Sequence, residues 1–340
     1  MLDNLDSNKT IDARVLQFDS SKSFKEIVDH CNQADLVVLY YLQGIKIKIL
    51  SLLNSNVKVA WFFFGAELYG RKTNNYLSLK TKKYLHGGLV RFIVSLFKNK
   101  TNQIFGSEKE VKLGAVCRKV DFFMCLSLHE YHALKREWPN LPGFLQLPID
   151  FPVTKSPIDK SAKKNVVIIG NSRNVWNNHF DIAERVLSHP RHTNYSVIIP
   201  FNYGGINRYT NRLESTIAGI DNVVCIDKFM PITDYENLVS IACAFVLNAY
   251  RPMAMWNIFT AMSNGVKVYL NKRNTTYEWL LDEGFLVFNI DQLIVDIGND
   301  NLNLKDHEVG HNLSLFEQLK EKCSIGKFND TIIKALGSPA

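Results

Sequence analysis

The sequence predicts an α/β protein of two Rossmann-like halves, each with a parallel sheet covered by helices. Three observations support this prediction. Apolar runs rich in Val and Ile alternate with segments in which apolar residues recur at helical spacing. Small polar loops such as Gly170-Asn171-Ser172 follow these runs, as expected where a buried parallel strand leads into a helix. A proline-rich stretch interrupts the alternation near the middle of the chain.

The N-terminal half alternates between strand and helix patterns. Strands are expected at residues 14–18, 34–42, 57–64 and 120–127, and helices at 24–31, 45–53 and 128–138. Such an alternation predicts a parallel sheet with helices on both faces.

The C-terminal half repeats the alternation more clearly. Strands are expected at 166–169, 196–200, 222–226, 244–249, 266–270 and 286–288. Helices are expected after the first of these strands and at 208–218, 233–241, 256–263 and 277–282, followed by a helical pattern from 291.

Four prolines in 141–160 mark a linker between the halves. We therefore expect two Rossmann-like domains, at 1–150 and 163–325, with a linker at 151–162 between them and a C-terminal helix or tail at 326–340. Open parallel sheets bind ligands outside the carboxyl ends of their strands. Two such sheets facing a central cleft form the architecture called GT-B among glycosyltransferases. Epimerases and two-domain binding proteins also fit it, so fold alone leaves function open.

Bulk composition favours a globular protein with anionic partners. The 340 residues are 46% hydrophobic and 21% charged, with a net charge of +7. The six cysteines form no C-x-x-C pair, which favours reduced thiols in a cytoplasmic protein. The polar N-terminus shows no signal pattern, and no apolar run approaches the ~18 residues that span a bilayer.

Residues 71–100 form an unusual basic segment. It holds eight Lys or Arg and no Asp or Glu, and Leu, Ile and Phe recur in it at helical spacing. A basic amphipathic helix suits a membrane interface, and the residues expected to contact the membrane are Lys80, Lys82, Lys83, Arg91, Phe92 and Phe97. The alternative is a core-packed helix with a solvated basic rim. Nucleic-acid binding through this segment is less favoured, because no RNA- or DNA-binding module accompanies it.

Three loops at strand ends of the second half are expected to converge. They begin at Gly170, Phe201 and Arg251. Strand, small polar loop and helix together present backbone N–H groups to a phosphate. Arg251 can pair with a diphosphate, assisted by the N–H groups of Trp256, Asn257 and Ile258. An ordinary strand-to-helix turn and a structural arginine are the alternatives.

These loops resemble a known family. IIGNSRNVWNNHF, IIPFNYGGINRY and AYRPMAMWNIFTAMSNGVKVYLNKRN look like the 4-alpha-L-fucosyltransferase family, and FFFGAELYG in the first half resembles its W-G-A-[DE]-L-Y stretch. The match covers most of residues 166–288. It implies a metal-independent, inverting GT-B enzyme at the cytoplasmic face of the inner membrane, in which residues 1–150 form the acceptor-binding domain, with the basic segment as an insert, and residues 163–325 form the nucleotide-sugar-binding domain. The expected substrates are a nucleotide-diphosphate sugar, TDP-linked by the resemblance, and a polyprenyl-diphosphate-linked glycan of surface polysaccharide synthesis (O-antigen, capsule or common antigen).

Two departures from the family pattern stand out. The family has a glutamine- and glycine-rich loop after the arginine, where this chain has Pro252-Met253-Ala254-Met255-Trp256. This leaves the donor sugar and the base open. Family members also begin with a strand and a polar loop that is not found before Arg14.

An inverting transfer needs a general base and a stabilised diphosphate. Glu67, which follows a strand and Gly-Ala, is the expected base, with helix capping or pairing to Arg71 as the alternative; His179 is the weaker candidate. No DxD-like metal motif is found and no cofactor is expected. The donor-binding residues are expected to be Gly170, Asn171, Ser172, Asn178, Tyr203, Arg251, Trp256, Asn257 and Lys272, with Tyr235 and Lys228 at the base or ribose. A two-domain nucleotide- or sugar-binding protein without turnover is the competing interpretation.

Overall fold

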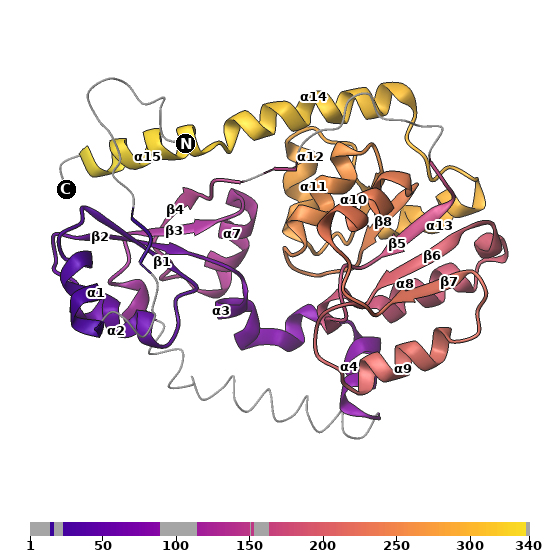
Figure 1. Ribbon diagram of the computed structural model, residues 1–340, viewed down its shortest axis with the longest axis horizontal. Coiled ribbons are helices and arrows are strands. Elements are labelled where there is room, and N and C mark those ends of the chain that lie inside the picture. The colour runs from indigo at the N-terminus through magenta and orange to yellow at the C-terminus, as the bar shows by residue number, and fades with distance from the viewer. Residues whose placement is uncertain (1–13, 17–22, 89–113, 150, 153–162, 338–340) are drawn as a thin grey trace. The chain divides into compact units, whose positions relative to one another are not determined.

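The computed structural model describes residues 14–16, 23–88, 114–149, 151–152 and 163–337 (Figure 1). Its contacts divide the chain into two compact units. Unit 1 comprises residues 1–68, 105–150 and 320–340, and unit 2 comprises residues 69–104 and 151–319. Each unit contains one sheet.

Unit 1 has four parallel strands in the order β1-β2-β3-β4. They are β1 Leu36–Tyr40, β2 Lys58–Phe62, β3 Phe122–Cys125 and β4 Gly143–Gln146. The helices that accompany them are α1 Phe24–Cys31, α2 Ile45–Leu52, α3 Ala66–Tyr69, α7 Leu128–Glu137 and α15 Ile325–Gly337. Phe328 and Ile332 of α15 pack on Ala60, Met124 and Leu145, so the end of the chain covers one sheet face (Figure 1). The predicted parallel sheet is confirmed.

Two predictions about this half differ from the structure. Residues 141–160 were assigned to a linker, yet residues 143–146 form β4. This strand lies at the sheet edge, and of its four residues only Leu145 is buried, so its pattern is weak. The strand expected at 14–18 is not found at residues 14–16, and residues 17–18 lie outside the described part of the chain.

Unit 2 has six parallel strands in the order β10-β9-β8-β5-β6-β7. They are β5 Val166–Ile169, β6 Ser196–Pro200, β7 Val223–Ile226, β8 Ala244–Leu247, β9 Lys267–Leu270 and β10 Phe288–Asn289. All six predicted strands are confirmed within a few residues. Counted from β5 along the chain, the order is 3-2-1-4-5-6, that of a dinucleotide-binding Rossmann sheet.

The helices of unit 2 alternate with these strands. They are α8 His179–Leu187, α9 Arg208–Ile217, α10 Ile232–Ile241, α11 Met255–Ser263, α12 Thr275–Asp282 and α13 Ile290–Gly298, with the short turns η2 Val175–Asn177 and η3 Pro190–Asn194. Helix α14 Asp306–Lys322 follows, and its last three residues count with unit 1. Buried Val and Ile of β5 and β6 form the core with apolar residues of α8, α9 and α13.

The described part of the basic segment packs on unit 2. It comprises η1 Gly70–Tyr76 and α4 Leu79–His86, and α4 contacts α8 and α9. Tyr84 packs against Phe180 with their ring centroids 4.4 Å apart, and Leu85 also packs on the core. These contacts are those of the core-packed alternative, whereas Leu79 of α4 is 72% exposed. Contact of Lys80, Lys82 and Lys83 with a membrane stays a prediction. Arg91, Phe92 and Phe97 lie outside the described residues.

Candidate functional site

The topological switch point of unit 2 lies between β5 and β8, where the strand order reverses. In such sheets the crevice for the ligand opens at this point, outside the carboxyl ends of the strands. The loop 170–178 follows β5, and the loop 248–254 follows β8. Two of the three loops singled out in the sequence therefore flank the switch point.

Gly170 allows the chain to turn sharply at the end of β5. Its φ is +76°, and a Cβ there would lie 2.7 Å from Nε2 of His179. Both constraints favour glycine. His179 is fully buried, and burial lowers its pKa to about 3, while an interaction with the Ser172 backbone acts in the opposite direction. His179 Nδ1 lies 3.3 Å from the Tyr209 hydroxyl, so this histidine is a neutral, hydrogen-bonded core residue.

Internal hydrogen bonds hold the loop after β5 in place. The Asn177 side chain donates to the backbone oxygens of Ser172 and Asn174, both at 3.1 Å. Asn171 Nδ2 donates to the Tyr203 hydroxyl at 2.5 Å, which joins this loop to the one after β6. Asn171, Ser172 and Tyr203 are thus brought together, as the sequence predicted for converging loops.

Asn178 joins three segments of unit 2 through hydrogen bonds of both its side-chain oxygen and its side-chain nitrogen. Its Oδ1 accepts from the Ser78 backbone N–H at 2.8 Å, and its Nδ2 donates to the carbonyls of Tyr76, Trp176 and Asn248. Asn248 Nδ2 donates back to the Asn178 carbonyl at 3.1 Å. Asn178 therefore positions loops, and its amide has no capacity left for a direct phosphate contact.

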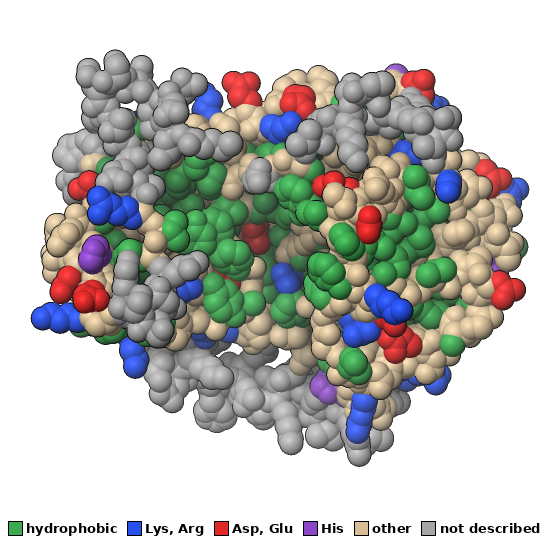
Figure 2. Space-filling model, viewed as in Figure 1, with side chains coloured by type: hydrophobic (Ala, Val, Ile, Leu, Met, Phe, Trp, Pro, Cys, Tyr) green, Lys and Arg blue, Asp and Glu red, His purple; other side chains and the backbone are tan. Residues whose placement is uncertain are grey.

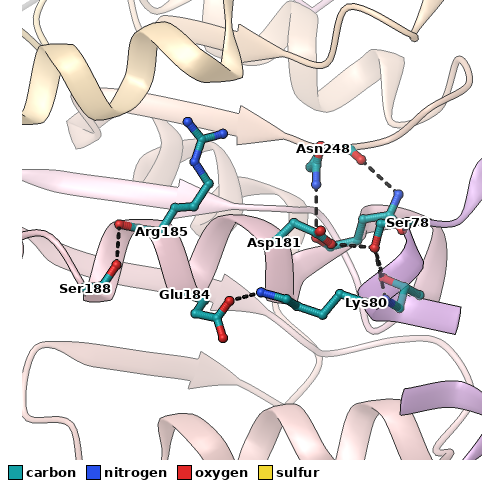
Figure 3. Close-up of polar contacts among 9 residues, drawn as sticks. Ser78, Lys80, Asp181, Glu184, Arg185, Ser188 and Asn248 are labelled. Atoms are coloured by element: carbon teal, nitrogen blue, oxygen red, sulfur yellow. Dashed lines mark hydrogen bonds and ion pairs between the residues drawn. The ribbon is translucent and has the colours of Figure 1, made fainter. Parts of the chain in front are cut away.

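The segment before α4 is fastened at the same point. Ser78 Oγ donates to Asp181 Oδ2 at 2.6 Å, and Lys80 forms an ion pair with Glu184 of α8 (Figure 3). Burial raises the pKa of Asp181, and the Ser78 hydrogen bond and Lys80 oppose this shift. These contacts connect η1 and α4 to the loop that follows β5.

Arg251 is stacked between two aromatic rings. Its guanidinium carbon lies 3.9 Å from the ring centroid of Trp176 and 5.2 Å from that of Tyr69, and only 8% of the residue is exposed. Arg251 Nη1 donates to the Pro252 carbonyl at 2.9 Å. Stacking fixes the plane of the guanidinium and keeps its charge beside the switch point.

The N-terminus of α11 lies four residues beyond Arg251. Its N-cap is Ala254, with φ +56° and no side-chain cap. The N–H of Ile258 donates to the Ala254 carbonyl at 3.0 Å, so the expected contribution of Ile258 to a phosphate site is wrong. The N–H groups of Trp256 and Asn257 precede it in the first turn, which has the positive end of the helix dipole.

Asn257 and Tyr235 also meet. Asn257 Nδ2 donates to the Tyr235 hydroxyl at 2.6 Å, which joins α11 to α10. Burial raises the pKa of Tyr235 to about 12, against the opposing effect of this hydrogen bond. Lys228 and Lys272 are exposed in loops after β7 and β9, whereas Arg273 lies over the Tyr250 ring and donates to the Asn75 carbonyl.

Glu67 belongs to unit 1 and is almost fully buried, with 2% exposed. Its Oε1 accepts from the indole N–H of Trp61 and from the backbone N–H of Phe64, both at 3.3 Å. These bonds anchor the turn between β2 and α3. They correspond to the capping alternative, and they leave the catalytic role a prediction.

Sequence reasoning missed Tyr69, Trp176 and Asn248. Asn248 carried a signal, because it is the polar residue that ends the apolar strand before Arg251. The two aromatic rings carried none, since their contact with Arg251 depends on chain segments far apart. Among the described residues no group of three or more His, Cys, Asp or Glu could hold a metal ion. No described helix is both long and apolar enough to cross a bilayer.

Comparison with known proteins establishes the fold. No family model and no curated protein matches the chain. The solved α,α-trehalose-phosphate synthase (UDP-forming) of Burkholderia xenovorans, in complex with glucose-6-phosphate, is similar over 93% of this chain and 76% of its own, with a TM-score of 0.59 and 11% identity.

Two further structures are similar over 92% of this chain. The GtfA/B complex has a TM-score of 0.54 and 14% identity, and the pneumococcal O-GlcNAc transferase GtfA, in complex with UDP and GlcNAc, has 0.52 and 12%. This chain spans only 59% and 58% of their lengths. The chain therefore has the α/β fold of the GT-B proteins, with two Rossmann-like domains, as predicted.

Proposed function

We propose that the protein is a glycosyltransferase that binds a nucleotide-diphosphate sugar at the switch point of unit 2. The observation that supports this most directly is the position of Arg251, a buried cation held between two rings and followed at once by a helix N-terminus without a side-chain cap. Such a pair of features suits a diphosphate. The solved GtfA with UDP and GlcNAc has the same fold.

The site residues divide by role in this proposal. Arg251 and the first-turn N–H groups of Trp256 and Asn257 stabilise the charge that develops on the leaving diphosphate. The backbone of Gly170, with Asn171, Ser172 and Tyr203, lines the sugar side, and Lys272 adds a further positive charge. Tyr235 and Lys228 contact the base or ribose. Asn178 holds the loops and is a positioning residue.

The acceptor and pathway follow from the family resemblance. We infer transfer of a deoxyamino sugar, probed first with a TDP-linked donor, to a polyprenyl-diphosphate-linked glycan in surface polysaccharide synthesis. The protein would then work as a peripheral protein on the cytoplasmic face of the inner membrane. The positive groups named above would carry the leaving-group charge without a metal ion.

The stereochemical course is proposed to be inversion, with Glu67 as the general base that takes the proton of the acceptor hydroxyl. Retention is the rival, since a solved trehalose-6-phosphate synthase of this fold, similar with a TM-score of 0.55 at 10% identity, is described as transferring with retention. The anomeric configuration of the first product, read by proton NMR, decides between them.

The donor site is tested by thermal unfolding with TDP, UDP, GDP and CDP. A nucleotide at about 100 times its Kd adds about 2.7 kcal/mol to the free energy of unfolding, so one of the four should raise the midpoint selectively. Arg251→Ala should remove the shift. Arg185→Ala is the control, because Arg185 is exposed and pairs with Asp291 on the surface. An equal shift in Arg251→Ala would show that Arg251 does not bind the diphosphate.

The buried, hydrogen-bonded state of Glu67 favours one competing function, a binding protein without turnover. Glu67→Gln keeps the size of the side chain and an acceptor oxygen for Trp61 and Phe64. If Glu67 is the base, this variant loses turnover by at least about 100-fold and retains the nucleotide shift. Donor binding in the native protein with no transfer to any lipid-linked acceptor would support the competing function.

A further inference from the structure

The surface of unit 1 has an exposed apolar patch at the ends of β1 and β2 and along α2. Hydrophobic side chains gather over the strands of unit 1 in Figure 2. We use the name α2 patch for the six large apolar residues that are at least 37% exposed in this region, Tyr40, Tyr41, Ile45, Ile47, Leu52 and Phe64. An exposed apolar patch of this kind marks an interaction site.

Three aromatic rings form one end of the α2 patch. Tyr40 and Phe62 are register partners on adjacent strands, and their rings stack at 4.4 Å between centroids. Phe64 continues the stack at 5.0 Å from Phe62. Tyr40 and Phe64 remain 51% and 58% exposed, so the stack is rigid and accessible. Tyrosine beside apolar rings is typical of the boundary between membrane and water.

Helix α2 forms the other end and differs from an ordinary surface helix. Helix α1 buries Ile27, Val28 and Cys31 and exposes charged residues on its other side. Helix α2 buries Ile49 and Leu50, yet Ile45 and Leu52 on one flank of this buried face, and Ile47 on the other flank, are exposed. Exposed apolar side chains on both flanks extend the apolar surface of the helix beyond the face that packs on the sheet.

The charge of this region is positive. The sequence contains no Asp or Glu between Asp35 and Glu67, whereas Lys46 and Lys48 of α2 lie in it; Lys58, at the start of β2, is paired with Asp121. The ammonium of Lys46 donates to the Tyr40 carbonyl, which places a cation at the aromatic stack. Lys48 is exposed on α2. Apolar, aromatic and cationic groups thus share one surface, as in segments that lie in an anionic membrane interface.

We propose that the α2 patch is the surface by which this protein contacts an anionic lipid membrane. On α4 of the predicted basic segment, by contrast, Tyr84 and Leu85 are packed on the core of unit 2, and Leu79 is its one large exposed apolar residue. A symmetric second copy of the chain fits less well, since it would bring Lys46 and Lys48 against the same lysines. The inference rests on the proposed function only for the biological role of such contact, namely access to a lipid-linked acceptor.

The test is co-sedimentation of the full chain with vesicles of phosphatidylcholine, with or without roughly one third phosphatidylglycerol, at low and high salt. The native chain should bind the anionic vesicles, and high salt should weaken binding. The variant Ile45→Ser/Ile47→Ser/Leu52→Ser should bind at least about ten-fold more weakly. Lys46→Gln/Lys48→Gln should lose about five-fold for each lysine, on anionic vesicles only.

Two matched variants serve as controls. Leu281→Ser/Val295→Ser removes exposed apolar side chains from α12 and α13 of unit 2. Lys82→Gln/Lys83→Gln removes the same charge from α4 as the α2 variant removes. Both should bind as the native chain does. A cooperative thermal transition in every variant, with a circular dichroism spectrum like that of the native chain, shows that the chain is folded.

Several results would overturn the inference. Absence of native binding to anionic vesicles would do so, as would patch variants that bind as tightly as the native chain, or controls that weaken equally. A change in oligomeric state with the patch variants, in the absence of lipid, would assign the surface to self-association instead. Loss of transfer to a lipid-free glycan acceptor, with vesicle binding intact, would assign it to the acceptor sugar. Vesicle binding without any nucleotide shift would contradict the proposed function and leave the membrane surface standing.

Discussion

Asn178 and Asn248 exchange two hydrogen bonds across the switch point, in which each side-chain amide donates to the other residue's backbone carbonyl at 3.1 Å. Asn178 is the last residue of the loop that follows β5, Asn248 is the first residue of the loop that follows β8, and the two strands are neighbours in the sheet. This reciprocal pair sets the spacing of the two loops that the proposal assigns to the donor. Asn271 at the end of β9 extends it by donating to Asn248 Oδ1 at 2.7 Å.

Replacing Asn178 should destabilise the protein by two separable mechanisms. Both Asn178→Gly and Asn178→Ala remove four hydrogen bonds, two of them buried and two partly buried, and should cost about 2–4 kcal/mol. Because φ at Asn178 is +47°, alanine should cost about 1 kcal/mol more than glycine. Urea unfolding of both variants measures the difference. Equal midpoints would mean that backbone strain at this position is negligible.

Gly170→Ala should be more destabilising than an ordinary glycine substitution. The new methyl group would meet the His179 ring at 2.7 Å while the backbone keeps a positive φ. Gly219→Ala is the control, because Gly219 has φ +80° and nothing within 4 Å of a Cβ, so it measures the cost of φ alone, about 1 kcal/mol. We expect Gly170→Ala to exceed it by at least about 1 kcal/mol in thermal or urea unfolding. Similar costs at both sites would show that the loop shifts without penalty.

The strands of unit 2 were predictable because strands buried on both faces read as continuous apolar runs, as in Val166–Ile169 and Ala244–Leu247. Strand β4 was missed because a short edge strand with one buried residue and a neighbouring proline has no such run. For the basic segment the sequence left two alternatives open, for a related reason. A helical apolar stripe does not tell which surface it covers, and only the contacts of α4 with α8 and α9 show that.

In the site, too, residues marked by the local sequence were predicted, and residues that depend on contacts made after folding were not. Gly170 and Arg251 were found from the sequence because they stand where apolar strands end, and strand ends are where an open sheet binds ligands. Trp176 and Tyr69 could not be found, since residues more than seventy positions from Arg251 stack on it only after folding. Asn178 was assigned to the donor because it lies in the loop after this strand, within the stretch that resembles the family, whereas its side chain makes four hydrogen bonds that hold neighbouring segments together.

His179 should make stability depend on pH in the mildly acidic range. Its folded pKa is about 3, mainly through burial, whereas an unfolded histidine titrates near 6.5. Between these values the unfolded chain binds a proton that the folded chain does not, so stability falls as pH falls from about 6.5. The slope from this group is at most about 1.4 kcal/mol per pH unit.

The variant that tests this is His179→Gln, compared with His311→Gln at an exposed position. Unfolding midpoints in urea from pH 7 to 5 should fall less steeply for His179→Gln than for the native chain, although its stability at pH 7 should be lower. His311→Gln should keep the native slope. An unchanged slope in His179→Gln would show that another group titrates in this range.

Lys267 and Asp296 form a buried ion pair whose disruption should be costly. Their side chains are 4% and 3% exposed and lie 2.8 Å apart, and Tyr269 and Gln292 also donate to the carboxylate. Removing one partner leaves a buried charge without its counter-charge, so Lys267→Met or Asp296→Asn should each cost about 3–5 kcal/mol. Arg185→Ala, which breaks an exposed pair with Asp291, should cost less than about 1 kcal/mol.

The same pair predicts an acid limb in the stability profile. Burial acts to raise the pKa of Asp296, but the hydrogen bonds from Lys267, Tyr269 and Gln292 outweigh it and lower the pKa below its ordinary value. A carboxyl with a lowered folded pKa contributes stability that is fully present above about pH 4 and is lost as pH falls through the folded value. The difference in unfolding midpoint between the native chain and Asp296→Asn should therefore be constant from pH 7 to about 5 and shrink below pH 4. A difference that stays constant below pH 4 would mean that folding does not lower the pKa of Asp296.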